Sequence, residues 1–191
     1  MTNKNYNRLS AEQKEKLGNS IVYLSNRIPY LSKTKLLKLI YILDEQSIKK
    51  SGIPFFNFEY KTWKLGPVAE EIFVDLSSET FLLKDFVEKT TYEDNIFIIS
   101  KADFNDDEFS ENDIELMEFV VKRFGGLSAN ELVEYTHKPN SPWYITAKKM
   151  NVLDLLLKQE INSTDFLVDM KSLIDHDDRK KSIYSDYLDF H

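Results

Sequence analysis

The stretch that decides the fold is residues 32–52, SKTKLLKLIYILDEQSIKKSG. Its apolar residues recur at the three- and four-residue spacing of one helical face, which predicts a long helix. Further apolar residues widen this stripe, so we expect the helix to be central and buried on two sides. Gly52 suits the left-handed conformation that commonly ends a helix. The stripe consists of Leu36, Leu39, Ile40 and Leu43, and Leu37 and Ile42 widen it.

Two further helices and a strand are expected around this central helix. Ser10 and Gln13 have the spacing of a capping box, so a helix is expected to begin there and to end before Pro29. After the central helix, residues 56–60 alternate apolar and polar, which predicts a half-buried strand that contains Phe56, Phe58 and Tyr60. Gly66-Pro67 then predicts another helix start, because proline suits the first helical position.

The remainder of the chain predicts one hairpin and several short helices. Residues 86–100 suit a hairpin that turns near 93–95, and Ser110, Ser128 and Ser141 each suit a helix N-cap. Residues 153–161 fit helix or strand equally. Ser163 or Thr164 is expected to cap a last helix, which carries Phe166, Leu167, Met170 and Leu173. The expected fold is α+β and mainly α: a compact helical domain with a small antiparallel sheet over residues 1–175, followed by a charged, mobile tail at 176–191.

The composition excludes several classes of protein. The 191 residues are 42% hydrophobic and 13% aromatic, which is enough for a core and argues against disorder. No apolar run has the roughly 18 residues of a membrane span, and the N-terminus does not resemble a secretory signal. The chain has no cysteine, which excludes thiol chemistry and fits a reducing cytoplasm.

The net charge of −7 is unevenly distributed. Residues 1–64 carry 12 Lys/Arg and 5 Asp/Glu, a balance of +7, and the remaining residues carry a balance of −14. The two halves can neutralise each other within one fold, which is the default interpretation. Alternatively, the acidic part meets a basic protein, or the basic part touches nucleic acid. Nucleic acid is the weakest of these partners, because the whole molecule repels phosphate.

No residue pattern predicts catalysis, a cofactor or a metal. His137 is better interpreted as a helix-end residue that bonds loop backbone than as a partner contact, and catalysis is a remote third, because no nucleophile, acid or second histidine accompanies it. The segment FGGLS lacks the ending of a phosphate loop, and ADFNDDEFS lacks the glycine and final glutamate of a calcium loop. Asp44 and Glu45 are adjacent in a helix, so they do not face each other as an acid–base pair.

Two tryptophans invite different interpretations. Trp143 lies in the first turn of the helix that Pro142 begins, where a tryptophan usually packs across the preceding corner. Trp63 is balanced between core packing and an interface role, with Lys64 beside it as an exposed contact.

Three segments together resemble a known family. They are KLLKLIYILDEQSIKKSGIPFF, YKTWKLGPVAEEIF and FGGLSANELVEYTHKPNSPW, in this order between about Lys35 and Met150. They are similar to the Panacea antitoxin domain family (SocA-like and phage-associated), whose pattern combines a K-L-x-K-L-x-Y-x-x-D helix, a GPV turn, T-H and P-W. The segment FFNFEYKTW departs from a turn that relatives often carry, and residues 1–34 contain only one clear helix, which is too little for a helix-turn-helix.

This resemblance implies a cytoplasmic, non-enzymatic protein that neutralises a toxin, often encoded by a neighbouring gene, through direct binding. The predicted partner contacts are Trp63, Lys64, Gly66, Pro67 and His137, and the predicted structural motif residues are Asp44, Thr136, Pro142 and Trp143. No cofactor, metal, membrane or nucleic acid is expected. Protease machinery is a further expected partner in the alternative interpretation, a proteolytic adaptor or phage-encoded regulatory module. A hydrolase is a third.

Overall fold

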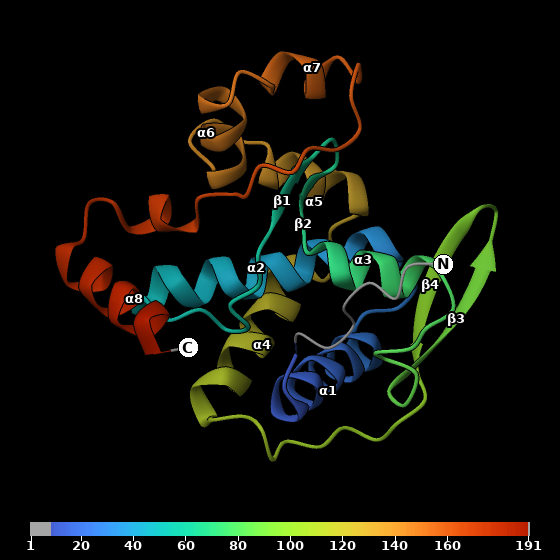
Figure 1. Ribbon diagram of the computed structural model, residues 1–191. Helices are drawn as coiled ribbons and strands as arrows, with labels where there is room; N and C mark the ends of the chain where they lie inside the picture. Colours follow the sequence, from blue (N-terminus) through green and yellow to red (C-terminus); the bar gives the residue numbers. More distant parts are fainter. Residues whose placement is uncertain (1–8, 191) are drawn as a thin grey trace. The chain divides into compact units, whose positions relative to one another are not determined.

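The computed structural model describes residues 9–190 (Figure 1). The predicted fold class is confirmed: the structure is mainly helical, with two small two-stranded antiparallel sheets instead of one. The chain divides into two compact units, Met1–Leu36 with Glu71–Gly126 and Leu37–Glu70 with Leu127–His191. Residues 1–8 of the predicted domain and His191 of the predicted tail lie outside the described residues. The predicted boundary at residue 175 stays a prediction.

The first unit is built on α1 (Ala11–Arg27) and the hairpin of β3 (Val87–Tyr92) and β4 (Asn95–Ser100). The predicted capping box is present, because Ser10 and Gln13 exchange side-chain bonds with backbone N–H groups. The hairpin turns at Glu93 and Asp94 as predicted, and both residues have positive φ. Within this unit α1 packs against the hairpin and against α4 (Glu111–Phe124), and its inner face is fully buried.

α3 (Glu70–Ser77) completes the first unit with the loop that follows it. The carboxylate of Asp75, which is completely buried, accepts the backbone N–H groups of Phe81, Leu82 and Leu83. These bonds order the segment between α3 and the hairpin, because each gives a hydrogen-bond acceptor to a backbone N–H group that would otherwise be unpaired in the interior.

α2 (Lys33–Ser51) is the predicted long helix, and its apolar stripe is buried as expected. Its first residues belong to the first unit, where the Lys35 Nζ donates to the carbonyl of Gly125 at 2.6 Å. The remainder belongs to the second unit. Gly52 follows the helix with φ +80°, which is the predicted left-handed stop.

The predicted strand through Phe56, Phe58 and Tyr60 is wrong. The strand begins only at β1 (Lys61–Trp63), and the preceding residues wrap around the side chain of Asp44. Asn57 has φ +65°, which an extended strand does not accommodate. The carboxylate therefore replaces a neighbouring strand as the partner of this backbone.

The predicted helix start at Gly66-Pro67 is also wrong. These residues form β2 (Gly66–Val68), which pairs antiparallel with β1, and the helix begins at Glu70. Gly66 has φ +97°, outside the right-handed helical region, so the chain turns here before Pro67 can start a helix.

The second unit also contains α5 (Ala129–Thr136), α6 (Pro142–Lys149) and α7 (Leu153–Leu157). The caps predicted at Ser128 and Ser141 are both present. α5 packs beside β2 and α6 beside β1, as Figure 1 shows at the upper part of the ribbon. α7 resolves the ambiguous segment at 153–161 in favour of a short helix.

The predicted last helix from Ser163 or Thr164 is wrong in its first half. Residues 166–168 run beside β1 instead, where Thr62 donates to the carbonyl of Phe166 at 2.9 Å and Val168 donates to that of Tyr60 at 2.7 Å. Only the 3₁₀ helix η1 (Met170–Ile174) remains helical. The edge of β1 that does not pair with β2 therefore forms backbone hydrogen bonds with this segment, although the apolar spacing of the segment predicts a helix.

The segment predicted as a charged tail contains α8 (Asp178–Phe190). Tyr184 is buried, and the Lys180 Nζ donates to the carbonyl of Lys49 at the end of α2. Within residues 9–190, no helix is long and apolar enough to cross a membrane.

Candidate functional site

The family-like segments meet in the second unit around one buried lysine, Lys38 of α2. Its side chain is 1% exposed, and its Nζ donates to the carbonyl of Pro67 at 2.8 Å. Burial lowers the pKa of Lys38 to about 7, because the charged form loses its hydration. Lys38 therefore ties α2 to the β1–β2 turn through a backbone carbonyl and not through a carboxylate.

Gly66 allows this close approach. A Cβ at this position would lie 2.5 Å from the Oγ1 of Thr136 and 3.2 Å from the Cε of Lys38. Thr136, in the last turn of α5, is 1% exposed and donates to the carbonyl of Val133. The glycine is thus required twice, for its positive φ and for the space that its missing side chain leaves.

His137 and Trp143 close the other side of this cluster. Their ring centroids are 3.8 Å apart, and the Trp143 Nε1 donates to the carbonyl of Trp63 at 2.9 Å. The pKa of His137 is lowered to about 4, mainly because burial disfavours the charged form; the charge of Lys38 acts in the same direction, and a hydrogen bond with the Lys64 backbone opposes both. His137 is consequently neutral at pH 7. Its Nε2 is buried, and no described residue bonds to it.

Asp44, six residues after Lys38 on α2, forms a second buried centre. Its carboxylate accepts the N–H groups of Phe56, Asn57 and Phe58 and, at 2.7 Å, the hydroxyl of Tyr60. Burial raises the pKa of Asp44, and these hydrogen bonds pull it back. The ring of Tyr60 also meets Tyr41 edge-on at 5.1 Å. The predicted motif residue Asp44 is thus the organiser of residues 56–60.

The structure brings the predicted residues together, but mainly in the interior. Gly66 and Pro67 are buried, whereas Trp63, Lys64 and His137 are half-buried. The four predicted motif residues, Asp44, Thr136, Pro142 and Trp143, are all buried. Partner contact by the first five stays a prediction, and the burial of Gly66 and Pro67 favours a structural role for them.

Lys38 is the member that sequence reasoning missed. It lies between Leu37 and Leu39, within the helix face that the apolar pattern predicts to be buried. A charged residue inside a helix that is buried on two sides is itself a signal, because lysine is almost never fully buried without a partner. In the described part of the chain, no group of His, Asp or Glu is arranged to hold a metal ion.

The arrangement is a scaffold of backbone-directed hydrogen bonds. Lys38 bonds to a main-chain group of β2, Asp44 to those of the segment before β1, and Trp143 to one of β1. Such bonds fix the path of the chain irrespective of the neighbouring side chains. The cluster therefore explains why these residue types are needed at these spacings.

Comparison with known proteins supports the same grouping. Residues 36–144, more than half of the chain, match the family described as "Antitoxin SocA-like, Panacea domain". Comparisons with curated proteins and with solved structures gave no match. The matched range contains Lys38, Asp44, Gly66, Thr136 and Trp143, the residues around which the second unit is built. The chain belongs to the SocA-like antitoxin Panacea domain family.

Proposed function

We propose that this protein is the antitoxin of a type II toxin–antitoxin system and neutralises a cognate protein toxin by direct, stoichiometric binding in the cytoplasm. The observation that carries the proposal is the family match over residues 36–144. The buried scaffold agrees with it, because its polar groups bond to the protein's own backbone. In this proposal the protein is not an enzyme, and it acts by covering a surface of the toxin.

An interface of ordinary size is sufficient for such neutralisation. Specific protein pairs bury on the order of 1,600 Å² in total, and a few central residues dominate the affinity. Of the five predicted contacts, only Trp63, Lys64 and His137 retain some exposure. Lys64→Glu is therefore the substitution that best tests the predicted site.

The test is co-expression of the chain with each neighbouring open reading frame. We expect one neighbour to stop growth when expressed alone, and to be harmless and co-purified when this protein is present. Gly126→Ala is a suitable control variant, because a Cβ at Gly126 meets nothing within 4 Å and the fold is retained. If no neighbour is both toxic and bound, neutralisation of a gene neighbour is refuted.

A proteolytic adaptor is the second candidate, and the end of α8 favours it. Leu188 and Phe190 are 45% and 84% exposed, so they offer an apolar contact for other machinery. Removal of the whole tail is a poor test, because Tyr184 is buried and Lys180 bonds to Lys49. Leu188→Glu with Phe190→Glu is cleaner: a pure neutraliser still binds and protects, whereas an adaptor binds the toxin but no longer protects.

A further inference from the structure

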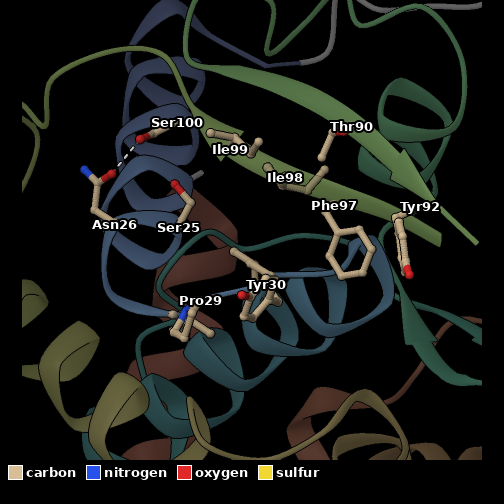
Figure 2. Close-up of a pocket in the computed structure, with 12 residues that line it drawn as sticks. Ser25, Asn26, Pro29, Tyr30, Thr90, Tyr92, Phe97, Ile98, Ile99 and Ser100 are labelled. Atoms are coloured by element: carbon tan, nitrogen blue, oxygen red, sulfur yellow. Dashed lines mark hydrogen bonds between the residues drawn. The ribbon is translucent and has the colours of Figure 1, made fainter.

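The first unit contains an apolar groove that the scaffold does not use. It has a volume of about 680 Å³ and lies between the chain at the end of α1 and the hairpin (Figure 2). Pro29 and Tyr30 lie on one wall, and Phe97 and Ile99 of β4 lie on the other. The remaining lining residues are Ser25, Asn26, Ile28, Leu31, Thr90, Tyr92, Ile98 and Ser100.

Tyr30 is the least expected residue of this groove. It is 87% exposed and has φ +52°, a conformation that bulky residues rarely adopt. Among the described non-glycine residues with positive φ it is the only aromatic one, and the others are Asn, Asp, Glu or Gln. Because the ring is exposed, it contributes little to the core, and a bulky residue held at positive φ favours a role in binding.

Three polar side chains that line the groove are engaged within the protein. The Ser25 hydroxyl donates to the carbonyl of Val22, and the Ser100 hydroxyl donates to the Oδ1 of Asn26, as the dashed line in Figure 2 shows. No charged side chain lines the groove. Small polar ligands need convergent free donors or acceptors for their orientation, so these walls suit apolar side chains better.

A strongly acidic segment follows the groove directly in the chain. Residues 102–121 contain eight Asp or Glu and no Lys or Arg, and Asp106, Asp107 and Glu108 are exposed. The segment is held on α1, because the Asn105 N–H donates to the Oδ1 of Asn19 at 2.9 Å. This segment holds negative charge beside α1, the helix that leads into the groove, and negative charge favours a basic partner.

We infer that this groove is the docking site for an apolar or aromatic anchor of a basic protein, flanked by Lys or Arg residues that face the acidic segment. The inference rests on the proposed function, because it assigns the toxin to this site. The anchor fills the groove between Tyr30 and Ile99. The acidic segment increases the rate of association, because opposite charges steer the encounter.

The experiment uses the full chain and the toxin identified by co-expression, with binding followed by surface plasmon resonance. Tyr30→Asn removes the ring while asparagine tolerates the positive φ, so the fold is kept. We expect it and Ile99→Asp each to weaken binding at least about tenfold, as loss of a central contact does. Leu157→Asp, at a residue that is 53% exposed on α7 and outside both the groove and the acidic segment, is the matched control and keeps wild-type affinity.

The electrostatic part of the inference has its own variant. Asp106→Asn with Glu108→Gln is expected to lower the association rate several-fold at low salt, with little change in the dissociation rate. The difference from wild type is expected to shrink as salt is added. An association rate that is identical to wild type at low salt contradicts a basic partner.

The outcomes separate this inference from the proposed function. If the toxin is neutralised and every groove variant binds it like wild type, or if Lys64→Glu alone abolishes binding, the groove assignment is overturned and the proposed function stands. If wild type self-associates and Tyr30→Asn does not, the groove is instead an interface between copies, which also overturns the inference.

A second probe decides the case in which no neighbour is toxic. A short synthetic peptide carries a tryptophan and a leucine between lysine-rich flanks, and its counterpart carries glutamate-rich flanks. We expect the basic peptide alone to shift the amide NMR signals of Tyr30 and Ile99. If neither peptide shifts these signals, or if both do so equally, the inference is wrong irrespective of the toxin.

Discussion

Lys38→Met tests whether the centre of the second unit is a buried amine. Burial lowers the pKa of Lys38 from 10.5 to about 7 in the folded protein. Between these two values the unfolded chain holds a proton at this position that the folded protein does not. Stability therefore rises with pH in this window, because the unfolded state binds more protons.

The size of the effect follows from one proton. A difference of one bound proton changes the free energy of unfolding by about 1.4 kcal/mol per pH unit. Between pH 7.5 and 9.5 we therefore expect wild type to gain about 2–3 kcal/mol relative to Lys38→Met, which has no group to titrate there. Only the difference between the two proteins is interpreted, because all other lysines and tyrosines are common to both.

The assay is urea unfolding at pH 7.5, 8.5 and 9.5, followed by the fluorescence of the tryptophans, one of which, Trp143, is fully buried. Lys101→Met is the control, because it makes the same substitution at an exposed lysine. If the stability difference between wild type and Lys38→Met is the same at all three pH values, Lys38 is not buried as described and the reasoning fails.

Three further predictions concern the same cluster. Gly66→Ala is expected to destabilise by more than about 2 kcal/mol, because its Cβ strains a positive φ and meets Thr136, whereas Gly126→Ala stays within about 0.5 kcal/mol of wild type in urea unfolding. Asp44→Asn is expected to cost about 2–4 kcal/mol, since it removes a charged acceptor from four donors, and an unchanged melting temperature would contradict this. Because the pKa of His137 is lowered to about 4, the unfolded chain binds more protons than the folded protein between pH 6.5 and about 4. The stability of wild type therefore falls as the pH is lowered through this range. In acid titrations followed by circular dichroism, we expect His137→Phe to lose less stability than wild type over the same range.

Helix starts at the capping boxes were predictable because their causes are local. Ser10, Ser110 and Ser128 each lie three residues before a side chain that returns the bond to the cap backbone, and all three capping boxes are present. The hairpin turn at residues 93–94 was equally predictable. In these features the two residues that bond to each other lie only a few positions apart in the sequence, so the sequence pattern itself contains both partners.

The errors occurred where a distant group decides the backbone. Residues 56–60 have strand-like alternation, yet the carboxylate of Asp44, twelve or more positions earlier, takes their N–H groups. Residues 166–168 have helical spacing, yet Thr62 and Tyr60 pair with their backbone from about a hundred positions away. Local propensity cannot anticipate such partners, because the competing hydrogen bonds exist only after the chain has folded.

The same distinction separates what the family pattern determines from what it leaves open. Lys38, Asp44, Gly66 and Trp143 are buried, and their contacts specify how the β1–β2 turn and the helices of the second unit are held together. A residue that is fully engaged with the protein's own backbone carries little information about a partner. The Ser25–Leu31 wall of the groove, in contrast, lies outside the matched residues 36–144, whereas the hairpin wall lies inside them.

This division has a physical consequence for the evolution of partner choice. Substitution in the buried cluster changes stability by whole kcal/mol, whereas substitution of exposed groove residues such as Tyr30 and Ile99 leaves the core untouched. One scaffold can then present different groove walls and different charges to different partners without refolding. If the groove is the toxin site, exchanging only its exposed residues Asn26, Pro29 and Tyr30 for those of a relative should change which toxin is bound while the melting temperature stays nearly constant. A loss of folding in such a chimera would show instead that the wall is part of the scaffold, and that the family pattern understates what the fold requires.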